Sequence, residues 1–366
     1  MSIDISRTIV FVGGGTAGHV EPALAVAQLW RSIHPDDRCI FIGTSEGLEN
    51  SLVPVAGFEL HRIPKVVLPR SLNLDLARLP FQLRKAVQDA RALISHSSLV
   101  IGFGGYVSAP VYLAARCEKV PIVIHEANAK VGWANRLGGL FTRYLAIAHP
   151  VRSGKFRQAK ITGLPLRADV LRAVNRAAGN WDKARTEAKL SLGWNLDHPT
   201  LLVLGGSQGS ISINSQIEKA IPTLISRGTQ VLHSVGAKNV LPKSGLNYTA
   251  TSYIADMSTA YLAADLIIAR SGAVTCAEVG ALGRFAIFIP LPIGNGEQAR
   301  NADHLVAAGR AMVISQREFS ANWLTTNFDS LMIRASKIPT KGLDDDLSAS
   351  DSIVDLMQKA LSEDRP

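Results

Sequence analysis

The chain has 366 residues, of which 47% are hydrophobic and 19% are charged. Because a globular domain usually takes about 100 to 200 residues, this length predicts two domains, and the composition excludes a disordered, collagen-like or disulfide-stapled chain. The net charge of +9 is uneven, since residues 1–165 carry 19 Lys and Arg against 11 Asp and Glu, and residues 166–366 carry 20 against 19. We therefore expect the anion that this charge attracts to meet the N-terminal half.

The first half of the chain alternates short Val, Ile and Leu runs with helical stretches, a pattern typical of a parallel sheet covered on both faces. Thr8–Val12 is the first expected strand, and a helix is expected from about His19 to Ser32 after a glycine-rich turn. The Gly/Pro punctuation of Ile161–Arg167 predicts a hinge. Further strands are expected at residues 38–42, 99–101, 122–125 and 144–148.

The opening pattern repeats at Thr200–Leu204, where an apolar run leads into a second glycine-rich turn and a helix at Ile211–Ser226. Asn180–His198 is expected to be an amphipathic connection, and a last helix at Asp351–Leu361 is expected to return to the first domain. Further strands are expected at residues 230–234, 266–269, 285–290 and 311–314. The prediction is two doubly wound α/β domains, residues 1–165 plus 349–366 and residues 166–348.

The three cysteines, Cys39, Cys117 and Cys276, are an odd number at wide spacings. This pattern is typical of reduced thiols packed as small hydrophobic side chains, and it predicts a cytosolic protein. The N-terminal residues lack the basic and apolar regions of a secretory signal. No run of about 18 or more apolar residues is present to span a bilayer.

The first glycine loop matches G-x-G-x-x-G at Gly13, Gly15 and Gly18. A nicotinamide enzyme needs an acid at the end of the second strand, and Phe41–Thr44 offers none. A phosphate-binding P-loop needs a lysine where this chain has His19. The loop is then either an anion site built from backbone N–H groups and a helix dipole, or a purely structural turn. His19 is a candidate general base, although it can equally orient the loop or an acceptor phosphate.

A second anion site is expected at Arg270–Glu278, where an apolar strand ends and a helix begins. Glu278, in that helix, is placed to accept both hydroxyls of a ribose, and the alternative is an ordinary solvent-exposed glutamate. Pro290–Gln298 is a polar loop whose amides and carboxylate can bind sugar hydroxyls, and the alternative is that it only turns the chain. His125–Asn128 follows a strand, which signals a site in open α/β sheets, although a structural role is the alternative.

Residues Arg62 to Arg91 contain seven basic and two acidic residues interleaved with apolar side chains. This mixture favours an anionic lipid surface over nucleic acid, because a duplex-binding face carries few exposed leucines. The alternative is a core-facing helix with a solvated basic face. The apolar positions of this basic segment are Leu68, Leu72, Leu74, Leu76, Leu79 and Phe81.

Together these motifs resemble the MurG family of bacterial glycosyltransferases, from about residue 8 to residue 315. The resemblance implies a GT-B architecture of two Rossmann-like domains facing across a cleft. It also implies an inverting enzyme of peptidoglycan synthesis that moves N-acetylglucosamine from UDP-N-acetylglucosamine to the C4 hydroxyl of undecaprenyl-diphospho-N-acetylmuramyl-pentapeptide, making lipid II from lipid I. The matching segments are Gly14–His19, Pro22–Ala25, Gly102–Ser108, His125–Asn128, Gly205–Gly209, Arg270–Ala273 with Glu278, and Gln298 with Asn301.

The resemblance also implies roles for particular residues. In the C-terminal domain, the donor diphosphate would meet Ser207 and the helix start at Ser271, Gly272, Ala273, Val274 and Thr275, with the ribose on Glu278. The uracil would meet the backbone of Ile254 and Arg167, and the sugar would meet Asn128 and Gln298. The acceptor diphosphate would meet Thr16, Ala17, Gly18 and His19, with Tyr106 nearby. The base would be His19, or else His125 or Glu126.

The resemblance implies no metal and no cofactor, since UDP-N-acetylglucosamine is a substrate. It places the protein peripherally on the cytoplasmic face of the plasma membrane, where other cell-wall synthesis proteins are possible partners. Ala17 replaces a usual glycine and Glu21 a usual aromatic residue, and both changes concern the acceptor side. Three alternatives remain, namely a GT-B transferase with another lipid or natural-product acceptor, a nicotinamide-dependent oxidoreductase, and a nucleic-acid-binding module, which the basic segment favours less than a lipid surface.

Overall fold

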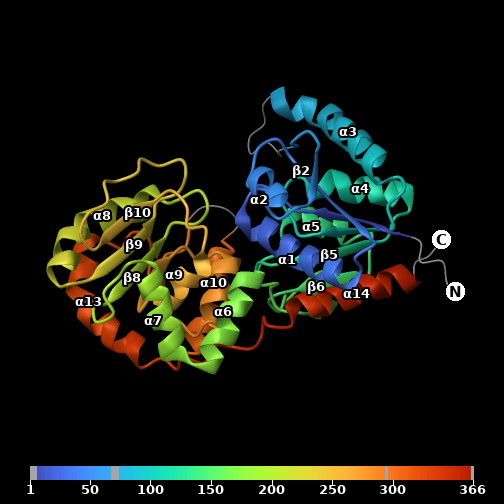
Figure 1. The fold of residues 1–366 in the computed structure, drawn as a ribbon. Helices are drawn as coiled ribbons and strands as arrows, with labels where there is room; N and C mark the ends of the chain where they lie inside the picture. Colours follow the sequence, from blue (N-terminus) through green and yellow to red (C-terminus); the bar gives the residue numbers. More distant parts are fainter. Residues whose placement is uncertain (1–5, 67–73, 293–295, 364–366) are drawn as a thin grey trace. The chain divides into compact units, whose positions relative to one another are not determined.

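The computed structural model describes residues 6–66, 74–292 and 296–363, with side chains omitted for residues 74–78. The chain divides into two compact units, Met1–Arg167 with Asp346–Pro366, and Ala168–Asp345. Each unit contains one parallel sheet with helices on both faces (Figure 1). The predicted fold class of two doubly wound α/β domains is confirmed.

The first unit has a seven-stranded sheet in the order β3-β2-β1-β4-β5-β6-β7. The chain builds outward from β1 to β3 and then returns to the other side of β1 with β4, where Val12 lies beside Gly102. The topological switch point therefore falls between β1 and β4, where doubly wound sheets bind ligands. The strands are β1 (Thr8–Val12), β2 (Arg38–Gly43), β3 (Glu59–Arg62), β4 (Leu99–Gly102), β5 (Ile122–Glu126), β6 (Tyr144–Ile147) and β7 (Lys160–Ile161).

Two apolar layers cover this sheet. On one face, α1 (Ala17–Ile33) packs beside α14 (Ala349–Glu363) (Figure 1). Phe11, Trp30 and Met357 are fully buried in that layer. On the other face, α3 (Leu74–Ile94) packs against α4 (Ser108–Glu118). The remaining helices are α2 (Glu49–Val55), α5 (Trp133–Gly138) and the short 3-10 helix η1 (Lys155–Gln158).

The second unit has a six-stranded sheet in the order β10-β9-β8-β11-β12-β13, so its switch point falls between β8 and β11. The strands are β8 (Thr200–Leu204), β9 (Gln230–Ser234), β10 (Tyr248–Thr251), β11 (Leu266–Ala269), β12 (Ala286–Phe288) and β13 (Ala311–Val313). The helices are α6 (Ala168–Gly179), α7 (Trp181–Ser191), α8 (Ile211–Ser226), α9 (Met257–Ala263), α10 (Ala273–Ala281), α11 (Gln298–Asn301), α12 (Asp303–Ala307) and α13 (Ala321–Ser336).

The structure differs from the sequence-based expectations in several places. The strands β3, β7 and β10 were not expected, and β7 includes Ile161, which was assigned to a hinge. The expected connection at 180–198 contains the regular helix α7. Cys39 and Cys276 are buried as expected, whereas Cys117 is exposed, so the expectation was wrong for that thiol. No helix in the described ranges combines the length and hydrophobicity needed to cross a membrane.

Candidate functional site

The loop between β1 and α1 lies at the switch point of the first unit. Gly15 has a φ of 90°, which favours glycine, and Thr16 is the N-cap of α1 in an extended conformation. The first turn of α1 contains no acidic side chain, and helix geometry leaves the N–H groups of Ala17 and Gly18 without acceptors inside the helix. The predicted residues Thr16, Ala17 and Gly18 thus offer N–H donors and the positive end of a dipole to an anion.

His19 is half-buried in the same turn. Its Nδ1 lies 3.1 Å from the carbonyl oxygen of Gly14 and 3.3 Å from Oγ1 of Thr16. Because a carbonyl oxygen only accepts, Nδ1 carries the hydrogen in the neutral ring, and Nε2 is the basic nitrogen. A Cβ placed on Gly104 would lie 3.3 Å from Nε2, so this nitrogen faces the loop after β4.

The loop after β4 contacts the first glycine loop directly. Gly104 and Gly105 have φ angles of 94° and 86°, and a Cβ on Gly105 would lie 2.6 Å from the carbonyl oxygen of Gly14. Only glycine permits this approach. The ring of Tyr106, which follows, lies 6.1 Å from that of Trp133, and both aromatic side chains are partly exposed.

His125 lies at the end of β5 and is completely buried. Its Nε2 lies 3.0 Å from the carbonyl oxygen of Gly163, so Nε2 donates to that oxygen in the neutral ring. Burial lowers the pKa of His125 to about 4. This ring is therefore neutral near pH 7. It holds the segment after β7 in place and is not exposed at the edge of the sheet.

Glu126 is also buried, and its carboxylate is fully engaged by the following loop. Oε1 accepts from the backbone N and Nδ2 of Asn128 at 3.0 and 3.1 Å. Oε2 accepts from the backbone N of Gly132 at 2.8 Å and from Nδ2 of Asn135 at 3.0 Å. Glu126 thus fixes the half-buried Asn128 at the carboxyl edge of the sheet.

Asn135 was not identified from the sequence. Its side chain is 1% exposed, and its Oδ1 accepts from the hydroxyl of Tyr112 at 2.8 Å. A buried amide that joins Glu126 to another helix is a positioning group. The available signal was its place in the first turn of α5, the helix that follows the His125–Asn128 motif.

The second unit has a matching glycine loop between β8 and α8. A Cβ on Gly205 would lie 2.6 Å from the backbone N of Ser210, so this turn requires glycine. Oγ of Ser210 accepts from the backbone N of Ile213 at 3.4 Å and caps α8. The predicted residue Ser207 lies half-buried in this loop.

Arg270 follows β11 and joins the loops around this second switch point. Its Nη2 donates to Oγ of Ser210 at 2.7 Å and to Oε1 of Gln316 at 2.6 Å. Its Nη1 donates to the carbonyl oxygens of Ile289 and Pro290, each at 3.0 Å. The side chain is buried, and burial lowers the pKa of the guanidinium. The sequence placed Arg270 in a motif but did not reveal this linking role.

The start of α10 adjoins Arg270. Gly272 is its N-cap and no side chain caps the helix, so the N–H groups of the first turn remain for a ligand. Ser271 is completely buried, and its Oγ donates to the carbonyl oxygen of Gln298 at 2.7 Å. Oε1 of Gln298 accepts from the backbone N of Leu291 at 3.0 Å. The predicted residues Gly272, Val274 and Thr275 are half-exposed here, beside buried Ala273.

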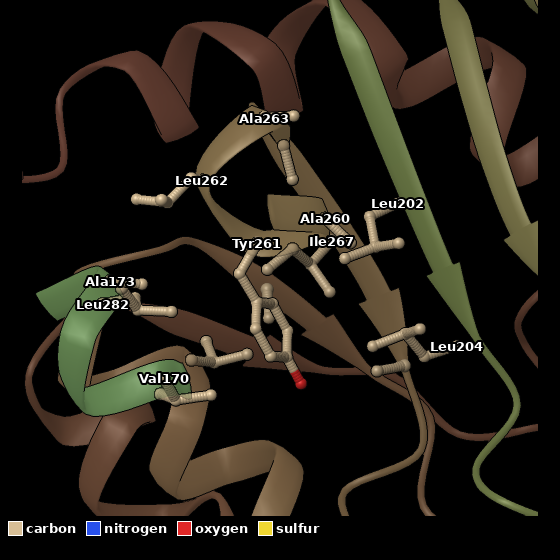
Figure 2. Close-up of a cluster of buried hydrophobic side chains, with 14 of the residues drawn as sticks. Val170, Ala173, Leu202, Leu204, Ala260, Tyr261, Leu262, Ala263, Ile267 and Leu282 are labelled. Atoms are coloured by element: carbon tan, nitrogen blue, oxygen red, sulfur yellow. The ribbon is translucent and has the colours of Figure 1, made fainter. Parts of the chain in front are cut away.

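Glu278 lies on α10 with only 2% of its surface exposed, so the solvent-exposed alternative was wrong. Its Oε2 accepts from the hydroxyl of Tyr261 at 2.8 Å. The ring of Tyr261 lies among apolar side chains that include Val170 and Leu204 (Figure 2). Ile254, predicted to meet the uracil, is buried in the same cluster.

The predicted donor residues therefore do not all lie in one unit. Ser207, Ile254, Ser271–Thr275, Glu278 and Gln298 belong to the second unit, around the β8–β11 switch point. Asn128 and Arg167 belong to the first unit, where Nη1 of Arg167 lies 3.8 Å from Oε1 of Glu21. In the described ranges, no group of three His, Cys, Asp or Glu side chains is arranged to hold a metal ion.

The sequence matches both halves of one known family. Residues 9–146 match the glycosyltransferase family 28 N-terminal domain, and residues 200–355 match the family 28 C-terminal domain. A protein of Corynebacterium glutamicum is 46% identical over 318 residues, which is 86% of each chain, and one of Thermobifida fusca is 42% identical over 337 residues, which is 90% of this chain and 87% of the other. Both are named UDP-N-acetylglucosamine–N-acetylmuramyl-(pentapeptide) pyrophosphoryl-undecaprenol N-acetylglucosamine transferase.

A solved structure is also similar over almost the whole chain. The crystal structure of Acinetobacter baumannii MurG has a TM-score of 0.69 and 27% identity, and the match covers 96% of this chain and 99% of the other.

Proposed function

This chain belongs to the MurG family of glycosyltransferases, and we infer that it transfers N-acetylglucosamine from UDP-N-acetylglucosamine to lipid I, forming lipid II. The observation that carries this inference is that a glycine loop contacts a neighbouring loop at the switch point of each sheet, through Gly14 and Gly105 in the first unit and through Ser210 and Arg270 in the second. Each pair lies at a helix start that favours an anion. Both substrates of the reaction contain a diphosphate, so one such site for each substrate is what the chemistry requires.

The donor nucleotide occupies the second unit in this proposal. The open N–H groups at the start of α10 bind the diphosphate together with the loop of Ser207. Glu278 accepts hydrogen bonds from the ribose, and its Tyr261 contact fixes the orientation of the carboxylate. Arg270 ties together the loops that surround this site. The same N–H groups stabilise the charge that develops on UDP as the glycosidic bond breaks.

The acceptor diphosphate meets the loop of Thr16, Ala17 and Gly18 in the first unit. Nε2 of His19 accepts the proton of the acceptor's C4 hydroxyl while that oxygen attacks the anomeric carbon and UDP leaves, so the configuration inverts. His19 is favoured over His125 and Glu126 because the ring of His125 is completely buried and donates to Gly163, and each oxygen of Glu126 already accepts two hydrogen bonds. Glu126 then holds the loop that presents Asn128, and His125 holds the segment after β7.

The first unit also supplies the proposed contact with the cytoplasmic face of the plasma membrane. Residues 1–165 carry 19 basic against 11 acidic residues. In the described part of α3, Phe81 is 78% exposed and lies close in sequence to exposed Arg84 and Lys85. An apolar side chain beside basic ones suits an anionic lipid surface. The predicted positions Leu68 and Leu72, and the side chains of Leu74 and Leu76, lie outside the described residues.

The test is a transfer assay with labelled UDP-N-acetylglucosamine and a lipid I analogue. We expect a labelled disaccharide product and one UDP for each sugar transferred. A parallel reaction with a natural-product acceptor that lacks the diphosphate is the control, and we expect no product from it. Folded enzyme that transfers sugar only to the control acceptor, or to neither, would contradict the proposed function.

A further inference from the structure

Glu49, the first residue of α2, is a completely buried carboxylate that the mechanism above does not use. Its Oε2 accepts from the backbone N of Gly15 at 2.8 Å. Its Oε1 accepts from the backbone N and Oγ1 of Thr44 at 3.1 and 3.0 Å. One side chain therefore links the first glycine loop to the loop after β2.

Glycines form the space that this carboxylate occupies. A Cβ on Gly14 would lie 2.8 Å from Oε1 of Glu49, and a Cβ on Gly43 would lie 2.6 Å from its Cγ. A Cβ on Gly47, which has a φ of 152°, would collide with Oε2. Gly14 in the first loop thus has a local role beyond turning the chain, because a Cβ there would collide with the carboxylate of Glu49.

Glu49 has no partner among the ion pairs of the described residues. A buried carboxylate without a nearby cation is costly unless several hydrogen bonds satisfy it. The donors from Gly15 and Thr44 do so here, and any displacement of Gly15 would leave the charge less satisfied. The position of the glycine loop and the burial of Glu49 are therefore coupled.

We propose that Glu49 is a positioning residue that turns the N–H of Gly15 inward and sets the loop so that the first N–H groups of α1 meet the acceptor diphosphate. This inference rests on the proposed function, which places the acceptor at this loop. The carboxylate lies behind an anion site, where its negative charge alone weakens anion binding. Removing the charge and loosening the loop thus have opposite effects on acceptor affinity.

The experiment compares Glu49→Gln with wild type in steady-state transfer to a lipid I analogue. The glutamine is nearly isosteric, but its NH₂ group replaces one oxygen that accepts hydrogen bonds in the wild type. This NH₂ group therefore faces a donor and cannot accept from it. We expect the KM for the acceptor to rise about tenfold, while the KM for UDP-N-acetylglucosamine stays within about twofold. The matched control, Glu59→Gln, removes a half-exposed carboxylate on β3 that pairs with Arg38, and both KM values should stay unchanged.

An acceptor KM that is unchanged or lower in folded Glu49→Gln would overturn the proposal, as would an equal rise in both KM values. If Glu49→Gln does not fold, Thr44→Val removes one donor and keeps the backbone contact. That variant must raise the acceptor KM selectively by about threefold, and an unchanged value overturns the proposal. Wild-type enzyme that fails to transfer sugar would instead refute the proposed function, so the two failures are distinguishable.

Discussion

The buried histidine of the second unit predicts how stability depends on pH. His233 is completely buried, with Nδ1 3.1 Å from the hydroxyl of Tyr248 and Nε2 3.1 Å from Oδ1 of Asn214. Burial lowers the pKa of His233 from 6.5 to about 4. As the pH falls below 6.5, His233 therefore binds a proton in the unfolded chain but stays unprotonated in the folded unit, and the free energy of unfolding decreases.

The size of the loss follows from the two pKa values. A shift of one pKa unit corresponds to about 1.4 kcal/mol, so the free energy of unfolding should fall by about 2 kcal/mol between pH 7 and pH 5 and by about 3 kcal/mol at pH 4 from this side chain alone. His125 predicts a comparable loss for the first unit, since burial lowers its pKa to about 4 as well.

The assay is urea unfolding at a series of pH values for wild type, His233→Gln and His96→Gln. The glutamine at 233 does not titrate, so we expect the pH dependence of that variant to be shallower by about 2 kcal/mol between pH 7 and pH 5. His96 is exposed, so His96→Gln is the control for replacing a histidine at the surface. If His233→Gln has the same slope as wild type, the reasoning from burial is refuted, whatever the stability of the variant at pH 7.

Other predictions concern the two proposed sites. His19→Gln should lower kcat by about a hundredfold or more with saturating substrates, and near-wild-type turnover in a kinetic assay would refute its role as the base. Arg270→Gln should weaken UDP binding by about tenfold, because the loops around the second switch point lose their shared donor, and calorimetry with an unchanged Kd would contradict this. Phe81→Ser should weaken binding to anionic vesicles severalfold in a sedimentation assay without changing turnover of a water-soluble acceptor, and unaltered vesicle binding would count against the membrane contact.

Most strands that the sequence predicted are buried on both faces, and the edge strand β13, which has an exposed Val313, is an exception. Thr200–Leu204, Gln230–Ser234 and Leu266–Ala269 have the predicted bounds, because continuous apolar runs distinguish central parallel strands. The unpredicted strands β3, β7 and β10 lie at sheet edges. Every side chain of β3 and β7 is at least partly exposed, so these edges lack the apolar run that reveals a strand.

The candidate site was predictable where backbone conformation determines the residue type. The loops at Gly13–Gly18 and Arg270–Ala273 were found because glycines at strand ends and helix starts have few other uses. Glu49 was missed because its burial depends on Gly14, which follows β1, as well as on Gly43 and Gly47, which lie at and after the end of β2, and only the folded sheet brings these two segments together. Glu126 was a candidate base by position alone, and its four hydrogen bonds emerge only when the following loop folds back.

The central claim is that each switch point serves one substrate, and paired variants test it most directly. Glu278→Gln alters the ribose contact in the second unit, and Gly105→Ala adds a Cβ 2.6 Å from the carbonyl oxygen of Gly14 in the first. In the transfer assay, Glu278→Gln should raise the KM for UDP-N-acetylglucosamine about tenfold and leave the acceptor KM within about twofold. Gly105→Ala should raise the acceptor KM about tenfold and leave the KM for UDP-N-acetylglucosamine within about twofold. The account is contradicted if both variants raise the same KM, or if each variant raises the KM that is predicted for the other.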